Sequence, residues 1–508
     1  MNEIIIDASL NQTRVAVMED DNLVELYIER ENHKRVAGNI YKGRVVNVLP
    51  GMQAAFVDIG LDKNAFLFVK EAIPPTVEKS KRNDISIKDV VKNGQEIIVQ
   101  VIKEAMGTKG ARVTTHITLP GRYLVLMPCV NYIGISRRIT DETERMRLKD
   151  IVEDLRPRNM GVIVRTVGGM KEEKELKEDL KFLLKLWRRI ENEKYLGYAP
   201  RIVYKDLDLI HRTIRDLFTQ NTTKLIVNDK EKFGTIKDFV KHISPHLEDR
   251  VTNLSIDLNI FDCYGIENMI KNAISRKVWL KSGGYIIFDK TEALTVIDVN
   301  TGKYVGSINL EDTVVKTNKE ASKEIAKQLR LRDIGGIIIV DFIDMDAKSA
   351  EEEVIEILKE ELKKDKTKTN VLGISSLGLL EMTRKKVKGR LSSILEKKCP
   401  YCSGTGSIMS EDTMIQNIEK EIRRISSHTN AEATLIEVSI NILNVLKAES
   451  NYIIKELERL LSIKVYFYGI IGMHDESFNV KAMGRLSQIK EVIDSYKNNK
   501  DFDKNLLA

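Results

Sequence analysis

The feature that most constrains the fold is a pair of apolar segments separated by a long amphipathic one. Residues 293–299 and 337–342 are almost continuously apolar, and residues 309–330 carry their apolar side chains at helical spacing. Strands that are apolar on both faces are typical of sheets covered by helices. The pattern therefore predicts a layered α/β sheet, to which residues 283–289 add a hairpin strand.

Short strands with turn residues between them precede this sheet. Residues 3–28 read as three strands, and residues 37–120 as many short strands with glycine turns, which is typical of a small barrel. Residues 171–193 predict an amphipathic helix. After residue 411, helix and strand patterns alternate again and predict a small separate domain. The expected fold class is thus a multidomain α/β mosaic.

The composition sets broad limits on where the protein works. The chain has 508 residues, of which 42% are hydrophobic and only four are cysteines. Its start lacks the basic segment of a secretory signal, and no apolar stretch reaches the roughly 20 residues of a membrane-spanning helix. We therefore expect a cytoplasmic protein with reduced thiols and no membrane span. The formal charge of +6 permits a nucleic-acid partner without establishing one.

Each of the two long apolar segments carries an aspartate at or near its end. A charge such as that of Asp298 or Asp341 is costly there unless it is paired or binds a cation. Asn300 would point to the same side of the strand as Asp298. Two carboxylates at neighbouring strand ends suit Mg²⁺, which can activate water for hydrolysis. Alternatively, the aspartates cap helices or pair with lysines, and the spacing alone does not decide.

A cysteine pair near residue 400 is typical of one half of a zinc site. Residues 399–406 read CPYCSGTG, whereas a closed zinc site has four ligands. Either Cys129, Cys263 or a histidine folds back onto Cys399 and Cys402, or a second copy of the chain supplies the same pair. A redox pair or two buried thiols are the alternatives.

Aromatic and basic residues of the predicted barrel are candidates for contacts with a nucleic acid. Phe56 and Phe66 could stack on bases, and Lys109 belongs to the same segment. The alternative for a phenylalanine in a strand is an ordinary place in the core.

A second basic group follows the barrel. Arg137 and Arg138, together with Arg165 and Thr166, combine guanidinium forks with a hydroxyl, which suits a terminal phosphate. A further basic stretch between residues 363 and 390 could follow an RNA backbone. Ordinary solvated charges are the alternative in both places.

Taken in order, these motifs resemble the ribonuclease E/G family over nearly the whole chain. The matching segments are AFVD at 55–58, FL at 66–67, GISRR at 134–138, IVRT at 163–166, IDVNTG at 297–302, RLRDIGG at 330–336, VDFIDM at 340–345, GLLEM at 378–382 and the knuckle at 399–406. Each segment alone is a weak signal, whereas their joint order is specific.

The resemblance implies a mosaic of subdomains. Residues 1–35 and 215–277 would form a ribonuclease H-like subdomain, 36–120 an OB-fold RNA-binding domain, 121–214 a sensor of the RNA 5′ end, 278–398 a deoxyribonuclease I-like catalytic domain, 399–411 a zinc-link and 412–508 a small oligomerisation domain. Structural Zn²⁺ would join two protomers through Cys399 and Cys402, and the last domain would pair dimers into tetramers.

The resemblance also implies an activity. Members of the family cut single-stranded RNA with Mg²⁺-activated water and leave a 5′-phosphate and a 3′-hydroxyl. They favour 5′-monophosphate ends and act in ribosomal RNA maturation or messenger RNA decay. By position, the Mg²⁺ ligands would be Asp298 and Asp341 with Asn300 as helper, the phosphate sensor Arg165 and Thr166, and further RNA contacts Phe56, Phe66, Lys109, Arg137, Arg138 and Lys368. Lys368 stands where the ribonuclease E pattern has an arginine, so its phosphate contact would be less fork-like.

Two other functions compete with this interpretation. A non-catalytic RNA-binding scaffold associated with ribosomes would keep the barrel and the basic clusters but would not need Asp298, Asn300 and Asp341 together. A nuclease acting on DNA would ignore the 2′-hydroxyl. The chain ends without a long polar tail, so we expect no degradosome scaffold and a place nearer the ribonuclease G branch of the family.

Overall fold

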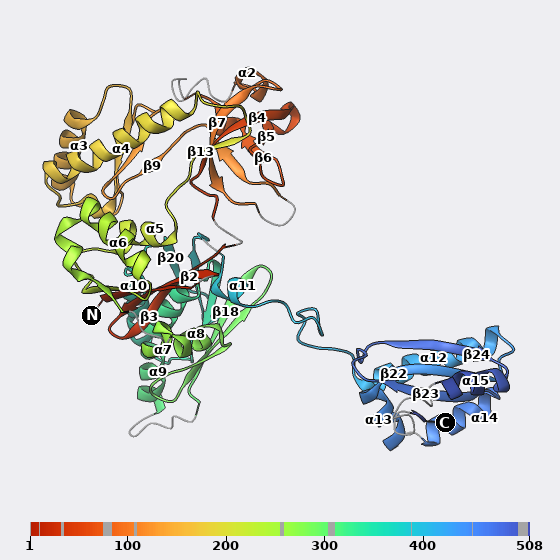
Figure 1. The fold of residues 1–508 in the computed structure, drawn as a ribbon. Coiled ribbons are helices and arrows are strands. Elements are labelled where there is room, and N and C mark those ends of the chain that lie inside the picture. The colour runs from red at the N-terminus through yellow and green to blue at the C-terminus, as the bar shows by residue number, and fades with distance from the viewer. Residues whose placement is uncertain are drawn as a thin grey trace. The chain divides into compact units, whose positions relative to one another are not determined.

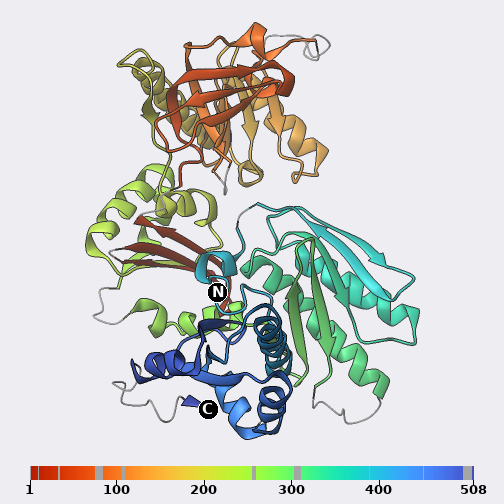
Figure 2. The ribbon, with the colours of Figure 1, turned by 90° about the vertical axis from the view of Figure 1, so that its right-hand side faces the viewer.

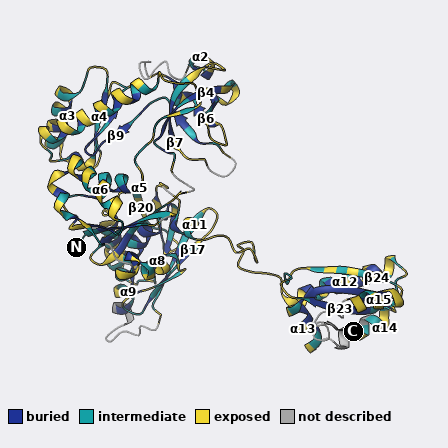
Figure 3. Cartoon of the chain, viewed as in Figure 1, coloured by how far each residue is buried: buried dark blue, intermediate teal, exposed yellow. Residues whose placement is uncertain are grey.

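The computed structural model divides the chain into two compact units, Met1–Leu395 and Glu396–Ala508 (Figure 1). It describes residues 2–9, 11–31, 35–74, 84–105, 109–254, 259–302, 310–387, 389–449, 451–495 and 506–507. Within these ranges, no helix is both long enough and apolar enough to cross a membrane. Buried positions concentrate on the sheets and on the helix faces that cover them (Figure 3).

The N-terminal strands share a sheet with segments from the middle of the chain. Its order is β15-β14-β1-β2-β3, from β1 (Asn2–Ala8), β2 (Gln12–Glu19), β3 (Asn22–Arg30), β14 (Lys224–Val227) and β15 (Val251–Asn253). Ile4 and Ile6 pack under α5 (Leu209–Leu217) and α6 (Lys230–Ile243), whereas Ile5 packs under α7 (Ile260–Cys263) and α8 (Ile266–Ile274). The apolar run of β1 is explained by burial on both faces. The ribonuclease H-like assignment itself stays a prediction.

The predicted small barrel is confirmed. Its strands are β4 (Ile40–Leu49), β5 (Ala54–Asp58), β6 (Ala65–Phe68), β7 (Glu96–Lys103) and β8 (Arg112–Thr114), with α1 (Val69–Ala72) and α2 (Ile87–Val90) between β6 and β7. Because β4 pairs with both β5 and β7, the sequence β4-β5-β6-β8-β7 closes on itself. A closed five-stranded barrel is consistent with an OB-fold.

A four-stranded sheet with two long helices follows the barrel. It has the order β11-β12-β10-β9, from β9 (Leu119–Pro120), β10 (Leu124–Met127), β11 (Ile133–Ile135) and β12 (Gly161–Val164). Helices α3 (Glu142–Leu155) and α4 (Glu173–Glu193) pack on it, and α4 confirms the predicted amphipathic helix. Strand β13 (Arg201–Tyr204) lies within the range predicted for the 5′ sensor but pairs with β4 of the barrel.

The predicted layered α/β sheet is also confirmed. Its order is β16-β17-β18-β19-β21-β20, from β16 (Lys277–Trp279), β17 (Tyr285–Lys290), β18 (Leu294–Asn300), β19 (Gly336–Asp341), β20 (Thr369–Ile374) and β21 (Leu379–Arg384). Helices α9 (Leu310–Leu331) and α10 (Lys348–Leu362) pack against one face of this sheet (Figure 2). The sequence suggested that helices cover both faces of this sheet. On the second face, however, Ile337 of β19 is 50% exposed, so that expectation is wrong there. We call this second side the open face.

The second unit forms the predicted small α/β domain. Strands β24 (Phe478–Gly484), β22 (Ala433–Ser439), β23 (Lys464–Ile470) and β25 (Leu506–Leu507) make its sheet in that order, with helices α12 (Glu411–His428), α13 (Ile440–Glu449), α14 (Asn451–Leu461) and α15 (Leu486–Ser495). After residue 411 the expected alternation of helices and strands is found, with the two helices α13 and α14 between β22 and β23. The first unit ends with the short helix α11 (Leu391–Leu395), whose Leu391 packs in the core shared with Ile5.

Candidate functional site

Two aspartates lie side by side at the ends of parallel strands. In the register of β18 and β19, Asp298 is directly opposite Asp341. Their neighbours Ile297, Val299 and Val340 are buried on the side covered by α9 and α10. Side chains alternate along a strand, so both carboxylates point to the open face. The aspartates predicted from sequence are thus brought together in a position that water and substrate can reach.

The electrostatics of this pair favour a bound cation. Partial burial, followed by the negative charges of Asp298 and Asp344, raises the pKa of Asp341. Asn300 Nδ2 donates a 2.7 Å hydrogen bond to Asp298 Oδ2 and holds that carboxylate in place. The amide oxygen of Asn300 is then directed elsewhere as an acceptor. Two carboxylate groups and an amide oxygen are ligands that Mg²⁺ accepts, so the residues fit this ion.

The alternative roles for the two aspartates find no support in the described part of the chain. None of the ion pairs there involves Asp298 or Asp341. Neither aspartate precedes a helix as its N-cap residue, because Asp298 lies within β18 and Asp341 ends β19. The same described residues contain no cluster of three or more His, Cys, Asp or Glu side chains suited to a metal. A cation here would therefore depend on the carboxylate pair and on substrate oxygens.

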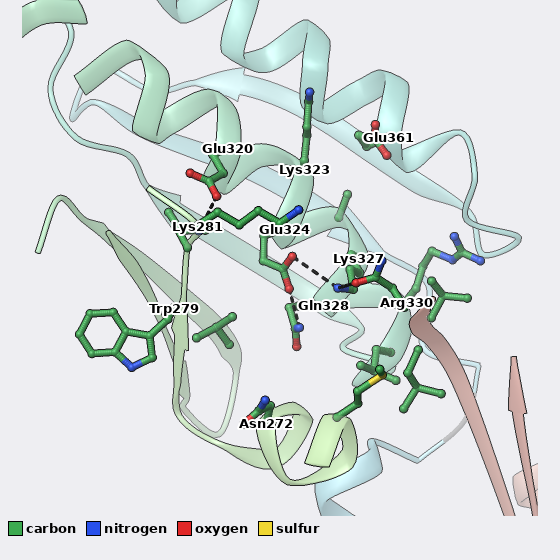
Figure 4. Close-up of a pocket in the computed structure, with 18 of the residues that line it drawn as sticks. Asn272, Trp279, Lys281, Glu320, Lys323, Glu324, Lys327, Gln328, Arg330 and Glu361 are labelled. Carbon is green, nitrogen blue, oxygen red and sulfur yellow. Dashed lines mark hydrogen bonds and ion pairs between the residues drawn. The ribbon is translucent and has the colours of Figure 1, made fainter. Parts of the chain in front are cut away.

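A large cavity of the first unit lies away from this pair. It has a volume of about 1080 Å³ and lies between α9, β16 and the β2–β3 turn (Figure 4). Among its lining residues, Glu320 accepts a hydrogen bond from the backbone N–H of Lys281, and Glu324 forms an ion pair with Lys327. Asp298 and Asp341 do not line it. The candidate catalytic site is therefore defined by the paired carboxylates and not by this cavity.

The barrel presents its two candidate aromatic residues on the outside. Phe56 and Phe66 are register partners on β5 and β6, with ring centroids 6.0 Å apart and planes at 71°. The alternate residues Val57 and Leu67 are fully buried inside the barrel. The core alternative is therefore wrong for these phenylalanines, which are half-buried on the surface.

Lys109 lies on the segment that leads into the strand next to that of Phe66. It is exposed and precedes β8, the strand that pairs with β6. A Cβ on the next residue, Gly110, would come within 2.1 Å of the Asn64 carbonyl oxygen, so only glycine permits this close approach. The three barrel residues predicted from sequence thus belong to one barrel, with Phe56 and Phe66 in contact and Lys109 on the segment beside the strand of Phe66.

The predicted phosphate sensor is assembled at the ends of two other parallel strands. β11 and β12 run parallel, and Ser136–Arg138 and Arg165–Thr166 follow them. The hydroxyl groups of Ser136 and Thr166 are 2.8 Å apart. Arg137, Arg138 and Thr166 are exposed, so this end of the sheet offers hydroxyl and guanidinium donors together.

Arg165 is more constrained than its neighbour Thr166. Its guanidinium forms a 2.7 Å ion pair with Asp216, and it also donates to the carbonyl oxygen of Gly121 at 2.6 Å. Its side chain is 26% exposed. Arg165 therefore fixes the turn around Gly121, and an incoming phosphate would have to share it with Asp216.

A loop of the α/β sheet reaches the sensor. Arg138 donates to the carbonyl oxygens of Asp365 and Lys366, and the exposed Lys368 follows two residues later. The buried Arg384 holds this loop through ion pairs of 2.7 Å with both Asp365 and Asp333. The structure therefore places Lys368 near the group that the sequence assigned to the 5′ phosphate.

The cysteine knuckle stands at the start of the second unit. The backbone N–H groups of Gly406 and Gly404 lower the pKa of the Cys402 thiol to about 7, which favours the thiolate form that binds metals. Tyr401 stacks on His474 with ring centroids 4.2 Å apart, which joins the knuckle to the small domain. The zinc assignment stays a prediction.

Sequence reasoning missed several residues that shape these sites. Ser136 was part of a quoted motif but received no role. Asp216 and His474 are far in sequence from Arg165 and Tyr401, and only the tertiary fold brings them together. Trp279 was given no role, and Tyr285 was treated only as a residue of the strand predicted over 283–289, although a tryptophan two residues after a lysine could have suggested an exposed ring.

Comparisons with known proteins agree with the assembled motifs. The family described as Ribonuclease E/G family matches residues 118–387. Ribonuclease G of Haemophilus influenzae is 41% identical over 487 residues, which are 95% of this chain and 99% of that protein. Ribonuclease G of Escherichia coli K12 is 41% identical over 486 residues, with the same coverage.

A longer relative matches along part of its length. Ribonuclease E of Haemophilus influenzae is 34% identical over 499 residues, which are 97% of this chain and 53% of that protein. The chain thus corresponds to about half of that relative and to nearly all of the ribonuclease G proteins. This chain belongs to the ribonuclease E/G family.

Proposed function

We propose that the chain is a magnesium-dependent endoribonuclease that hydrolyses single-stranded RNA and leaves 5′-phosphate and 3′-hydroxyl ends. The observation that carries this proposal is the direct pairing of Asp298 with Asp341 on the open face, with Asn300 bound to Asp298. Relatives named ribonuclease G and ribonuclease E support RNA as the substrate. Ribosomal RNA precursors, messenger RNAs or both would be cut.

The residues of the chain divide the chemistry among them. Asp298 and Asp341 would hold Mg²⁺, which lowers the pKa of a bound water and stabilises the leaving oxygen when present. Asn300 keeps the Asp298 carboxylate oriented and offers its amide to the water or to the scissile phosphate. The open face leaves room for an extended strand, which favours a single-stranded substrate.

The barrel and the sensor would hold the RNA on either side of the cut. Phe56 and Phe66 offer ring surfaces for base stacking, and Lys109 offers a charge for the backbone. Thr166, supported by Ser136, would bind a 5′-monophosphate together with Arg165, and the exposed set of Arg137, Arg138 and Lys368 would add positive charge. A preference for 5′-monophosphate ends follows from these donors.

We also propose that Cys399 and Cys402 bind one half of a structural zinc site. A tetrahedral site needs four ligands, and within the described residues one chain supplies this pair without a third metal-ligating neighbour. A second copy would complete the site by two-fold symmetry and make the protein at least a dimer. Pairing of dimers through residues 412–508 would give a tetramer.

A cleavage assay with a matched control tests the catalytic assignment. Asp298→Asn should abolish Mg²⁺-dependent cleavage of a 5′-monophosphorylated oligoribonucleotide. Asp346→Asn, which changes an exposed carboxylate five residues beyond Asp341, should cleave like the parent chain. Unchanged cleavage by Asp298→Asn would show that the assignment is wrong.

Two further arms decide between the competing functions. A matched DNA strand should not be cut, because the 2′-hydroxyl is the group that distinguishes the substrates. RNA that is bound but never cut, under any Mg²⁺ concentration, would identify a non-catalytic scaffold instead.

A further inference from the structure

An aromatic pair lies on the same open face as the carboxylates. Trp279 on β16 is directly opposite Tyr285 on β17, and Tyr285 is directly opposite Asn300 on β18. Register partners point to the same side of a sheet, so these three side chains form a row across the open face. The adjacent row contains Lys277, Ile287, Asp298 and Asp341.

The two rings are held in place without being covered. Their centroids are 5.4 Å apart with planes at 66°, an edge-to-face contact. The ammonium group of Lys277 lies 4.0 Å from the Trp279 ring centroid and 3.5 Å from that of Tyr285. Trp279 nevertheless remains 63% exposed, whereas the other tryptophan, Trp187, is 8% exposed. The aromatic pair is therefore preorganised, with one large ring surface facing solvent.

We propose that Trp279 and Tyr285, with Lys277, form a stacking platform for a base next to the cleaved bond. Neighbouring strands are about 4.8 Å apart, so β16 lies roughly 10 Å from β18. A nucleotide stacked on Trp279 therefore belongs to the same stretch of strand as a phosphate at Asp298. This inference rests on the proposed function and adds a binding position to it.

The chemistry of the platform favours a nucleotide over an apolar protein surface. An ammonium group between two rings can stay paired when an anionic strand binds, whereas an apolar partner would bury that charge at a cost. Trp279 and Lys277 also line the cavity beside α9, and the Trp279 ring points away from the charged side chains of Glu320 and Glu324 there (Figure 4). The platform therefore lies where the open face meets the edge of this cavity.

Fluorescence provides a direct test, because the chain has two tryptophans. A Trp187→Phe variant leaves Trp279 as the emitter. Titration with a single-stranded oligoribonucleotide in EDTA should quench this emission, and a fully abasic strand of the same length should not. No quenching by the RNA, or equal quenching by both strands, would overturn the proposal. Emission that changes with protein concentration and not with RNA would overturn it too, because the ring would then lie between copies of the chain.

Kinetics on singly abasic substrates locate the stacked base. In the parent chain, removal of one particular base should lower kcat/KM by about 5- to 150-fold, the range expected for one stacking contact. On the intact substrate, Trp279→Ala should lower kcat/KM by a similar factor, and on that abasic substrate it should lower kcat/KM no further. Trp279→Phe should keep most of the parent kcat/KM on the intact substrate. If the losses in kcat/KM from Trp279→Ala and from removal of the base simply multiplied, the base would not stack on Trp279.

Two controls separate this inference from the function on which it rests. Tyr195→Ala is the first control, because Tyr195 is also an exposed ring with an ammonium group, that of Lys194, 4.7 Å from its centroid. Tyr195 lies just after α4 and not on the open face, so this variant should behave like the parent chain. Cleavage of intact RNA by the parent chain tests the proposed function in the same experiment. An active parent with an unchanged Trp279→Ala variant would remove the platform alone, and an inactive parent would remove the function.

Discussion

Asp298 on β18 lies directly opposite Asp341 on β19, and the charge of Asp298 contributes to the raised pKa of Asp341. Such a pair is unfavourable for a metal-free fold and useful for a protein that binds a cation. Stability and activity should therefore respond in opposite directions when one carboxylate is removed.

Asp341→Asn should raise the Tm of the metal-free protein at neutral pH, because it removes the repulsion within the pair. Mg²⁺ should raise the Tm of the parent chain and leave that of the variant nearly unchanged, since a ligand stabilises only the state that binds it. Thermal unfolding in EDTA and in Mg²⁺ measures both effects.

The pH dependence of this stability difference has a definite sign. The pKa of Asp341 is raised in the fold above its unfolded value of about 3.9, so the folded state holds more protons between the two values. The parent chain should lose stability relative to Asp341→Asn as the pH rises through that window, and the two should converge below it. A variant that is less stable than the parent at neutral pH without Mg²⁺ would contradict the repulsive pair.

Phe56→Ala and Phe66→Ala should each weaken binding of single-stranded RNA by about 5- to 150-fold, from the loss of one stacking surface. Because the rings touch, the double variant should lose less than the product of the two effects. Fluorescence anisotropy with a labelled oligoribonucleotide measures the affinities. Val46→Ala, at a position on β4 that is 49% exposed, serves as the control, and equal affinities for all variants would exclude the barrel face.

Local patterns predicted the elements better than they predicted the sites. The strands of Asp298 and Asp341 were expected because apolar runs and an intervening amphipathic helix are local signals, and the closed barrel followed from short strands with glycine turns. The β20–β21 hairpin and strand β24 were not predicted. Their apolar signal is short and interrupted by polar residues.

The sites depend on register and on contacts between distant segments. Sequence shows that Asp298 and Asp341 end two strands, but only strand order makes them neighbours. The same holds for Ser136 with Thr166, and the row that Tyr285 forms with Asn300 likewise depends on register. Local periodicity does not contain this information.

Thr166→Val should reduce discrimination between RNA ends. A hydrogen bond to a charged group contributes roughly 1.5–3 kcal/mol, so the preference for a 5′-monophosphate over a 5′-hydroxyl should fall by about tenfold or more. Ser136→Ala, which removes the partner of Thr166, should have a smaller effect of the same kind. Competing cleavage of the two RNAs gives the ratio. Thr143→Val, at an exposed position, is the control. An unchanged ratio of 5′-monophosphate to 5′-hydroxyl cleavage for Thr166→Val would show that Thr166 is not part of the sensor.

Arg384→Met should destabilise the first unit by about 3–5 kcal/mol, the range for breaking one side of a buried ion pair. Its side chain is 3% exposed, and its loss would leave Asp365, at 4%, without its cation. Urea unfolding measures the change, with the exposed neighbour Lys385→Met as control. A loss below about 1 kcal/mol would show that Arg384 does not hold the loop that carries Lys368.

Cys399→Ser and Cys402→Ser should each lose bound zinc and convert the oligomer to monomers, because either change leaves a shared site with two thiolates in place of four. Metal analysis and light scattering measure the two effects. Cys263→Ser, at an exposed thiol of the first unit, should keep both zinc and oligomer. An unchanged oligomer that contains no zinc would exclude the shared site.

The most direct measurement is the chemistry of the product ends made by the parent chain and by Asp298→Asn from one 5′-monophosphorylated single-stranded RNA. Hydrolysis by metal-activated water predicts 5′-phosphate and 3′-hydroxyl ends that appear only with Mg²⁺ and are absent with Asp298→Asn. Products with 2′,3′-cyclic phosphate ends, or the same products from Asp298→Asn, would contradict a catalytic centre at Asp298 and Asp341.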